Sequence, residues 1–391
     1  MSVTAVATAL LGVYKRAEPQ FVAGRGCRLI DDEGREYIDL TSGIGVNAFG
    51  YRDAETARVV AEALDAGVIH VSNLYRTAPG EELAEELVSR SFADKVFFCN
   101  SGGESTEAAI KFARRWAREA GGPGKHEIVA LRGGFHGRLF GSLAITDRPA
   151  YQAPFEPLMP GARIVAADLD SVREVVSPAT TAAIFVEPVQ GEGGVVPLPG
   201  DFLAGLRSLA DEANALLVFD EVQCGMGRTG HLFAYQATGT EPDILTLAKP
   251  LAGGLPMGAV LLSERVAATI RPGDHATTFG GGPLVASVAV SVMRRIVSPG
   301  FLENVLECGD QIRRVAQGWA ESGLICSARG LGLMWGLELF TPAAPIVSRA
   351  LDAGLLVLTA GERVIRLLPP LVIDAAELAA GLDILGEALR Q

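Results

Sequence analysis

The sequence predicts an α/β protein in which a large domain with a mostly parallel central sheet is joined to a smaller α+β domain built from both ends of the chain. Two observations lead to this prediction. Between residues 80 and 270, short continuous apolar runs alternate with helix-like stretches, which is typical of strands buried on both faces of a parallel sheet. On either side of that region the chain reads as hairpins and helices. We therefore expect a small-domain segment at 1–50, a large domain at 51–280 and the rest of the small domain at 281–391.

The predicted strands of the large domain are the short apolar runs. They are Val96–Cys99, Ile128–Leu131, Ile164–Ala166, Ala183–Val186, Leu216–Phe219, Ile244–Ala248 and Ala259–Leu262. Helical periodicity fits Glu107–Ala117 and Phe202–Ala213, where apolar residues recur on one face. Strands and helices in alternation are the pattern of a parallel sheet covered by helices.

The two flanks carry a different pattern. Residues 21–40 read as a hairpin that turns at Asp32, Glu33 and Gly34. After residue 300 come an amphipathic helix, a strand pair around Leu331–Leu339, the short runs "GLLVL" and "VIRLLPP", and a final helix. We expect these flanks to pack together.

The composition narrows the classes of function. The formal net charge is −12, and no run of about five or six basic residues is present. Nucleic acid and anionic membranes are therefore unexpected partners. The longest strongly apolar segment, Pro283 to Met293, is too short to span a bilayer, and the first residues lack the basic start of a signal peptide. We expect a cytoplasmic protein.

The cysteines and histidines form no metal or disulfide pattern. The five cysteines are widely spaced without a C-x-x-C pair, and the five histidines show no H-E-x-x-H spacing. We therefore predict reduced cysteines and no metal site.

The segment after the first predicted strand could hold a phosphate. "NSGGESTEAAIKFARRW" is a polar loop with two glycines followed by a helix, and the free N–H groups at such a helix start attract anions. The same residues could equally form an ordinary helix start with Ser101 as its cap. By itself this segment leaves both interpretations open.

An acid and a lysine end two other predicted strands. Asp220 follows Leu216–Phe219, and Lys249 follows the next apolar run along the chain. The ends of neighbouring strands would bring the two side chains to one rim. They could form a buried ion pair. They could also serve as an amine nucleophile and an acid that holds a cationic ring nitrogen.

The second interpretation requires a phosphate cradle, an aromatic ring to stack on a flat cofactor, and a cation for a substrate carboxylate. "GGFHGRLFGS" supplies Phe135 and Arg138. Together with Lys249, Asp220 and the 101–103 loop they meet the needs of a pyridoxal phosphate site. Two other classes remain: a nicotinamide oxidoreductase, suggested weakly by the G-x-G-x-x-G match at 225–230, and a phosphate-binding protein without catalytic activity.

Ten ordered blocks carry a resemblance to a known family over nearly the whole chain. They are "GIGVNAFG", "HVSNLY", "NSGGESTEAAIKFAR", "FHGR", "PFEPLMPG", "VEPVQGEGG", "FDEVQCGMGRTG", "LAKPLAGGLPMGA", "GDHATTFGGGPL" and "VIRLLPPLVI". In these blocks the sequence resembles the class III, fold type I pyridoxal-phosphate aminotransferases, specifically the acetylornithine aminotransferase group. The resemblance implies the fold type I architecture and pyridoxal 5′-phosphate as the cofactor.

The resemblance also implies roles at the cofactor. Lys249 would bind it covalently and carry the proton, and Asp220 would pair with its pyridine nitrogen. The remaining contacts implied are Val222 and Phe135 on the two ring faces, Gln223 near the ring hydroxyl, and Gly102 and Gly103 at the phosphate through their N–H groups. Gly103 departs from the family pattern, which usually has a threonine there, so one hydroxyl contact with the phosphate is missing.

Further implied roles concern the substrates and a second subunit. Thr278 would reach the phosphate in the partner subunit, which makes a homodimer with a shared active site part of the expectation. The implied substrate contacts are Arg138 to the α-carboxylate, Arg366 to a second carboxylate, Glu192 pairing with Arg366, Thr277 beside the substrate and Tyr14 at the entrance.

The activity implied is a transfer of the terminal amine of N2-acetyl-L-ornithine to 2-oxoglutarate, as in arginine biosynthesis, giving N-acetylglutamate semialdehyde and glutamate. The same machinery would serve succinylornithine, ornithine, a carrier-linked lysine or 4-aminobutyrate. "HVSNLY" and "PFEPLMPG" favour acetylornithine.

Overall fold

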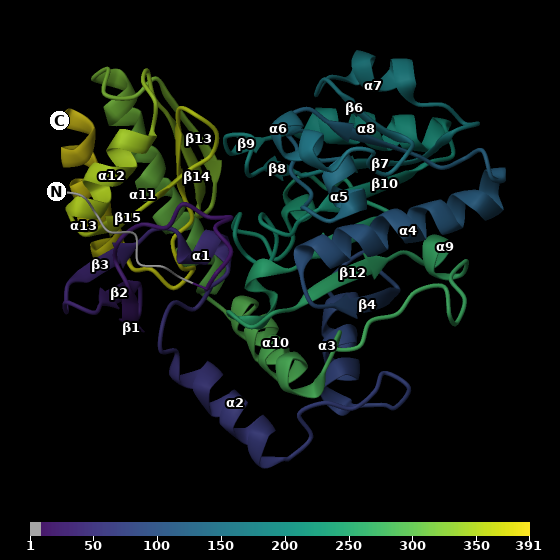
Figure 1. Cartoon of the computed structure of the whole chain (residues 1–391), viewed down its shortest axis with the longest axis horizontal. Coiled ribbons are helices and arrows are strands. Elements are labelled where there is room, and N and C mark those ends of the chain that lie inside the picture. Colours follow the sequence, from purple (N-terminus) through teal and green to yellow (C-terminus); the bar gives the residue numbers. More distant parts are fainter. Residues whose placement is uncertain (1–8) are drawn as a thin grey trace.

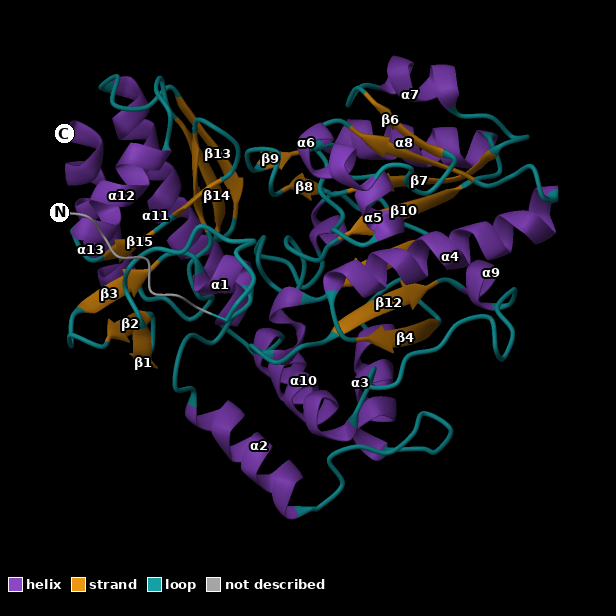
Figure 2. Cartoon of the chain, viewed as in Figure 1, coloured by secondary structure: helices purple, strands orange, loops and turns teal. Residues whose placement is uncertain are grey.

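The computed structural model describes residues 9–391, and its central feature is a seven-stranded sheet (Figures 1 and 2). The strands are, in spatial order, β4 (Lys95–Cys99), β12 (Gly258–Leu262), β11 (Ile244–Leu247), β10 (Leu216–Asp220), β7 (Thr181–Val186), β5 (Glu127–Leu131) and β6 (Ala162–Val165). Each of the seven apolar runs forms one of these strands, so the predicted strands are confirmed. The predicted α/β fold with a mostly parallel sheet is confirmed as well.

Strand direction decides which loops share an edge of this sheet. β11, β10, β7, β5 and β6 pair in parallel, whereas β12 runs antiparallel to both of its neighbours, β11 and β4. β4 therefore points the same way as β11. The carboxyl ends of six strands and the start of β12 consequently meet at one edge.

The two faces of the sheet are buried in separate apolar clusters. Val218, Ile244 and Val260 pack in one cluster, while their chain neighbours Phe219, Leu245 and Leu261 pack in the other. This alternation follows from side chains pointing to opposite faces of a strand. Burial on both faces explains why the strands read as continuous apolar runs.

Long amphipathic helices cover these faces. α4 (Gly102–Gly121) contributes Ile110, Ala113 and Trp116 to the first cluster, and α8 (Gly200–Glu212) contributes leucines to the second. The predicted helices 107–117 and 202–213 lie in α4 and α8, as expected. The other helices of this part are α2 (Ala54–Asp65), α3 (Ala78–Val88), α5 (Phe140–Ala144), α6 (Pro149–Gln152), α7 (Leu169–Val175), α9 (Glu264–Ala267) and α10 (Pro283–Ile296).

Strands from both ends of the chain join in a second, four-stranded sheet. Its order is β1 (Phe21–Arg25), β2 (Arg28–Asp31), β3 (Glu36–Asp39) and β15 (Leu355–Leu356), so residues 355–356 pair with residues 38–39. The predicted turn at 32–34 joins β2 to β3, and a further strand, β1, precedes that hairpin. Figure 1 shows these strands on the left, beside helix α13 (Ala375–Arg390).

A third sheet and the remaining helices complete the C-terminal part. The sheet has the order β13 (Ser327–Leu331), β14 (Met334–Glu338), β17 (Val364–Leu367) and β16 (Leu358–Thr359). The other helices of the C-terminal part are α11 (Phe301–Glu321) and α12 (Ala344–Asp352). Two elements from earlier in the chain remain, helix α1 (Ser42–Gly45) and a small ribbon that pairs β8 (Val189–Gln190) with β9 (Val196–Pro197). α10 packs against α2 and α3, although the expected boundary places it in the C-terminal segment. The boundaries at 50 and 280 stay a prediction.

The G-x-G-x-x-G match at 225–230 forms a packed joint between these parts. Arg228 is fully buried, and its guanidinium donates to the carbonyl oxygens of Leu333 and Pro369. A Cβ on Gly230 would collide with Leu306 of α11. Residues 225–230 are therefore enclosed by protein, which explains the match without a dinucleotide.

None of the helices in residues 9–391 is by itself long and apolar enough to cross a membrane, and only α10 and α11, bent by 69° at their junction, meet the length and composition test as a pair.

Candidate active site

A cavity of about 340 Å³ lies at the edge where the parallel strands end. Ligands of open α/β sheets bind at this edge. The walls come from the segments that follow β4, β5, β7, β10 and β11 and from the segment that precedes β12. The lining includes Gly102, Gly103, Phe135, Glu187, Glu192, Asp220, Val222, Gln223 and Lys249. All but Glu187 are residues to which the sequence resemblance assigns a role.

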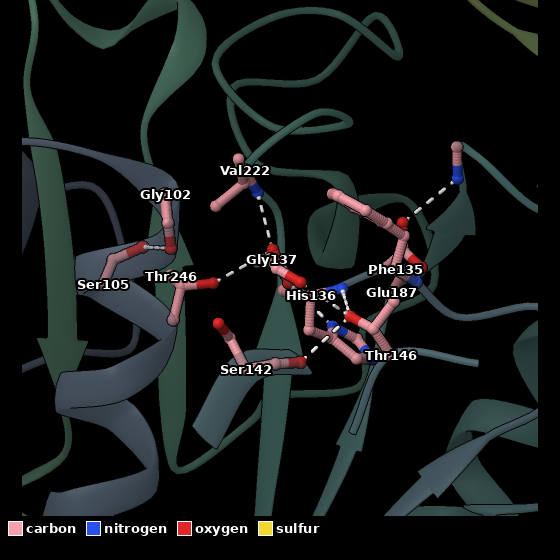
Figure 3. Close-up of polar contacts among 12 residues, drawn as sticks. Gly102, Ser105, Phe135, His136, Gly137, Ser142, Thr146, Glu187, Val222 and Thr246 are labelled. Atoms are coloured by element: carbon pink, nitrogen blue, oxygen red, sulfur yellow. Dashed lines mark hydrogen bonds and ion pairs between the residues drawn. The ribbon is translucent and has the colours of Figure 1, made fainter. Parts of the chain in front are cut away.

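Asp220 is the last residue of β10 and lies buried at the floor of this cavity. One carboxylate oxygen, Oδ2, is 2.8 Å from His136 Nδ1. The other, Oδ1, accepts from the Thr246 hydroxyl at 3.1 Å and from the Val222 N–H at 3.1 Å. Figure 3 shows Thr246, Val222 and His136 grouped in this part of the site. A carboxylate has about four acceptor positions, so room for one further donor remains.

His136 is a site residue that the strand-end reasoning passed over. It follows Phe135 in the loop after β5, is 3% exposed, and contacts Asp220 from two strands away in the sheet. Burial alone would lower the pKa of His136, but the hydrogen bond and charge of Asp220, with the charge of Glu187, outweigh it and hold the pKa above its usual value. The block "FHGR" contains this histidine, so its position next to Phe135 could have indicated from the sequence that it belongs to the site.

Lys249 follows β11 and begins the 3₁₀ turn η3 (Lys249–Ala252). Its side chain is partly buried, and within residues 9–391 its amine has no hydrogen-bond or ion-pair partner. Burial, and then the charge of Arg366, lower the pKa of this amine to about 8 against the opposing charges of Glu192 and Asp220. At neutral pH a larger fraction of this amine is therefore neutral than in an ordinary lysine, and the neutral form is the one that attacks a carbonyl.

The start of α4 forms one wall of the cavity. Ser101 caps the helix by accepting from the N–H of Glu104, and Gly102 and Gly103 line the cavity. A Cβ on Gly102 would lie 2.7 Å from Val222 Cγ1, which is too close, whereas a Cβ on Gly103 would meet Leu139 at an ordinary 3.4 Å. Val222 thus packs directly against Gly102 at the helix start, and the positive dipole end of α4, which borders the cavity, favours an anion.

Glu187 directly follows β7 and holds the loop that carries Phe135. Its carboxylate accepts from the N–H groups of Phe135 at 2.8 Å and of Gly191 at 3.1 Å. Burial raises the pKa of Glu187 to about 7, and Asp220 adds to this increase, while His136 opposes it. The sequence resemblance assigns no role to Glu187, and the structure shows its carboxylate joining the backbone at Phe135 to the backbone at Gly191.

Arg366, on β17, is 3% exposed and contacts two residues of the cavity lining, Glu192 and Gln223, from the C-terminal part of the chain. Its Nη1 lies 2.5 Å from Glu192 Oε1 and 3.3 Å from Gln223 Oε1, and its buried Nε has no partner within the described residues. The expected pairing of Glu192 with Arg366 is therefore present. Glu192 lines the cavity and is only partly buried, so this ion pair lies beside the cavity.

Besides Arg366, four other residues with expected roles lie outside the lining of this cavity. Arg138 is exposed and lies 3.8 Å above the ring of Tyr151. Thr277 and Thr278 line a separate hollow of about 760 Å³, although the Thr277 hydroxyl accepts from Asn100, which lines the first cavity. Tyr14 is 73% exposed. Their roles stay predictions.

Comparison with known proteins identifies the family. The family model for class-III aminotransferases matches residues 14–389. The chain belongs to the class-III aminotransferases. This aminotransferase is 47% identical to the mitochondrial acetylornithine aminotransferase of Alnus glutinosa over 97% of the chain and 85% of that protein. Among solved structures it resembles the N-acetylornithine aminotransferase of Stenotrophomonas maltophilia (37% identity, TM-score 0.83, 96% of each chain) and the ornithine aminotransferase of Toxoplasma gondii (27%, 0.92, 98% and 92%).

Class-III aminotransferases depend on pyridoxal 5′-phosphate, and the cavity of this aminotransferase fits that cofactor. The start of α4 suits its phosphate, because Gly102 and Gly103 line the cavity at the N-terminal end of that helix. Asp220 retains an acceptor position for a ring N–H, and the amine of Lys249 is unpartnered within the described chain. These are independent features of one cavity, and each matches a different part of the cofactor.

Proposed function

We propose that this enzyme transfers the terminal amino group of N2-acetyl-L-ornithine to 2-oxoglutarate, giving N-acetylglutamate semialdehyde and glutamate. The supporting comparison is sequence identity: among solved structures it is 37% with an N-acetylornithine aminotransferase against 27% with an ornithine aminotransferase, each over nearly the whole chain. The observation that carries the chemistry is the amine of Lys249, unpartnered within the described residues, in the same cavity as Asp220 and as Glu192, which pairs with Arg366.

Lys249 and Asp220 would perform the central steps. The neutral amine of Lys249 is both a nucleophile for a carbonyl and a base that moves a proton between the two carbons involved in the transfer. Asp220, held by His136 and Thr246, would keep a ring nitrogen protonated. Pyridoxal phosphate, when bound, accepts the amino group and delocalises the electron pair left when carbon loses its proton.

The remaining residues would position the cofactor and exclude water. The N–H groups of Gly102 and Gly103 would hold the phosphate at the start of α4. Phe135 and Val222 would enclose the ring between them, and Gln223 would approach its hydroxyl. Their placement around one cavity supports these roles.

Two arginines would serve two substrates in turn. Arg366 would bind the distal carboxylate of 2-oxoglutarate once Glu192 moves away, because the guanidinium Nε is already without a partner in the described chain. When the other substrate enters, Glu192 would return and neutralise Arg366. Arg138 would hold the α-carboxylate of acetylornithine, with Thr277 beside the substrate and Tyr14 near the entrance.

A homodimer would complete the site. The hollow lined by Thr277 and Thr278 lies beside exposed apolar side chains, with Leu74, Tyr75 and Phe279 exposed by 89%, 70% and 64%. Such a cluster is typical of a protein interface. We propose that a second copy covers it and receives Thr278 at its cofactor phosphate. Sedimentation equilibrium tests this, and a monomer at micromolar concentration would contradict it.

We also propose that the enzyme works in a reducing compartment such as the cytoplasm. Its five cysteines are all unpaired in the structure, and four of them are buried. Full activity of protein purified under strong reductant supports this proposal, and activity that requires oxidation would contradict it.

The substrate assignment is tested by a panel of amino donors. Purified enzyme is given 2-oxoglutarate with N2-acetylornithine, N2-succinylornithine, ornithine or 4-aminobutyrate, and glutamate formation is followed. We expect the highest kcat/KM with N2-acetylornithine. A higher value for ornithine or 4-aminobutyrate would reassign the substrate, and no glutamate with any donor would overturn the transamination itself.

A further inference from the structure

A second cavity, of about 350 Å³, lies at the far end of α4 from the active site. It is formed by the C-terminal half of that helix and by the loop that leads to β5. Figure 1 shows α4 extending from the middle of the molecule to its right-hand edge, where this loop begins. The nitrogen-bearing side chains in the lining are Lys111, Arg114, Arg115, Arg118, Lys125 and His126, and its one acid is Asp274.

The carboxylates near this basic pocket are already engaged. Arg115 forms ion pairs with both Asp274, at 3.0 Å, and Glu119, at 2.7 Å. Glu119 also faces Arg271 at 3.9 Å. Within the described chain no ion pair forms with the other four cations of the lining.

Two of these four cations, Lys125 and Arg114, are held by hydrogen bonds to neutral backbone carbonyl groups. Lys125 is 1% exposed, and its amine donates to the carbonyl oxygens of Pro178 at 2.8 Å and Ala213 at 3.1 Å. Arg114 donates in the same way to the carbonyl of His126. Carbonyl oxygens satisfy hydrogen bonds without cancelling charge, so the positive potential of both groups remains in the pocket.

The other two cations, Lys111 and Arg118, are exposed, and few contacts hold their side chains in place. Lys111 donates to His275 Nδ1 at 2.8 Å, which leaves its charge intact because that histidine nitrogen must be unprotonated to accept. Arg118 stands in the last turn of α4 and has no partner within the described residues. Its five N–H donors are therefore available to a ligand.

We propose that this pocket binds a small multivalent anion, such as a phosphate group, through Arg118 and Lys111 over the fixed charges of Arg114 and Lys125. A concave site of this size admits a small molecule, and the overall charge of −12 makes a large polyanion such as nucleic acid a poor occupant. Free inorganic phosphate and the phosphate of a metabolite share this chemistry.

The test measures binding of inorganic phosphate and of pyrophosphate to the enzyme loaded with pyridoxal phosphate, by calorimetry at fixed ionic strength. Loading the enzyme fills the phosphate site at the other end of α4, so any remaining binding must occur elsewhere. We expect Arg118→Glu to weaken binding by about tenfold or more, because it replaces a donor with a repelling charge. Arg118→Lys, which keeps the charge, should lose no more than about threefold.

Arg173→Glu is the matched control. Arg173 is also an exposed arginine in the last turn of a helix, α7, but it lies outside the pocket. The same charge change there should leave the affinity unchanged within about twofold. The proposal is overturned if the wild-type enzyme shows no binding, if chloride reproduces the effect, or if Arg118→Glu and Arg173→Glu behave alike.

Discussion

At the scale of single residues, the site depends on how Asp220 is held. Its two oxygens are bound by His136, Thr246 and the Val222 N–H, so the carboxylate cannot rotate without breaking several hydrogen bonds. A fixed carboxylate stabilises a developing positive charge without any cost of reorganisation during the reaction. The orientation of Asp220 is therefore as important as its charge.

We expect Asp220→Asn to keep the cofactor and to lose about a hundredfold in kcat/KM. A carboxylate 4 Å from a cationic ring nitrogen is worth about 4 kcal/mol at an effective dielectric of 20. If about 3 kcal/mol of this acts in the transition state, its loss lowers the rate by about a hundredfold. Absorbance measures the cofactor and a coupled assay measures the rate. Thr246→Val, which removes one hydrogen bond to Asp220, should cost about fivefold, and wild-type turnover in Asp220→Asn would refute its role.

We expect reconstitution of the apoenzyme with pyridoxal phosphate to accelerate as pH rises to about 8 and then to level off. The pKa of Lys249 lies at about 8, so below that pH the amine is mostly protonated and about tenfold less of it is reactive per pH unit. Stopped-flow absorbance gives the profile.

Arg366→Gln provides the control for this profile. Arg366 lowers the pKa of Lys249, so its removal should shift the midpoint to higher pH. Lys249→Ala should yield no borohydride-stable link to the cofactor at any pH. A midpoint unmoved in Arg366→Gln would show that burial alone sets the pKa.

The sequence indicated Asp220 and Lys249 because each interrupts an apolar run, but it could not indicate His136. The partner of His136 lies 84 residues away, and the contact depends on β10, β7 and β5 being neighbours in the sheet. Nothing local in "FHGR" fixes that order. The exposure of Arg138 on Tyr151 likewise depends on tertiary packing.

At the scale of elements, the start of α4 is specialised by two adjacent glycines with different surroundings. Gly102 faces Val222 so closely that no side chain fits, while Gly103 has room for one. We expect Gly102→Ala to weaken cofactor binding by about tenfold or more, since the added carbon must displace Val222. Gly103→Ala should change binding by less than about twofold, since only an ordinary contact is added.

Titration of apoenzyme with pyridoxal phosphate, followed by absorbance, measures both variants. They carry the same substitution in neighbouring positions, so any general effect on the helix is shared. Equal losses in the two variants would mean that contact with Val222 does not matter.

The elements themselves were largely predictable. Seven apolar runs gave seven strands because each is buried on both faces and needs no alternation. The direction of β12 was not predictable, because antiparallel and parallel central strands show the same apolar run. β1 was missed as a separate strand because residues 21–31 read as one arm of the predicted hairpin, whereas in the structure they form two paired strands, β1 and β2.

At the scale of the whole molecule, the parts are joined by contacts too close for side chains. In α11, Gly309 approaches the turn between β13 and β14 so closely that a Cβ would lie 2.3 Å from the carbonyl oxygen of Gly332. Gly318, in the same helix, has no atom of residues 9–391 within 4 Å of that position. The helix is thus seated on the third sheet through one glycine.

We expect Gly309→Ala to lower the free energy of unfolding by about 1–3 kcal/mol, because backbone must shift to admit the methyl group. Gly318→Ala should raise it by up to about 1 kcal/mol, the gain in helix propensity at an exposed position. Urea unfolding of both variants gives the comparison. A lower free energy of unfolding for Gly309→Ala together with a higher one for Gly318→Ala would support the close packing of Gly309 on Gly332. A stabilised Gly309→Ala would contradict it.

The position of Lys249 between two paired strands has a consequence for repeated turnover. β11 ends at Leu247, β12 begins at Gly258 beside it, and α10 packs on η3 between them. The backbone at Lys249 is therefore anchored on both sides. An amine that has been released stays within reach at an effective concentration far above any free amine in solution, where well-oriented groups reach about 10⁵ M or more. Return of the lysine after each cycle is thus a local event that diffusion does not limit.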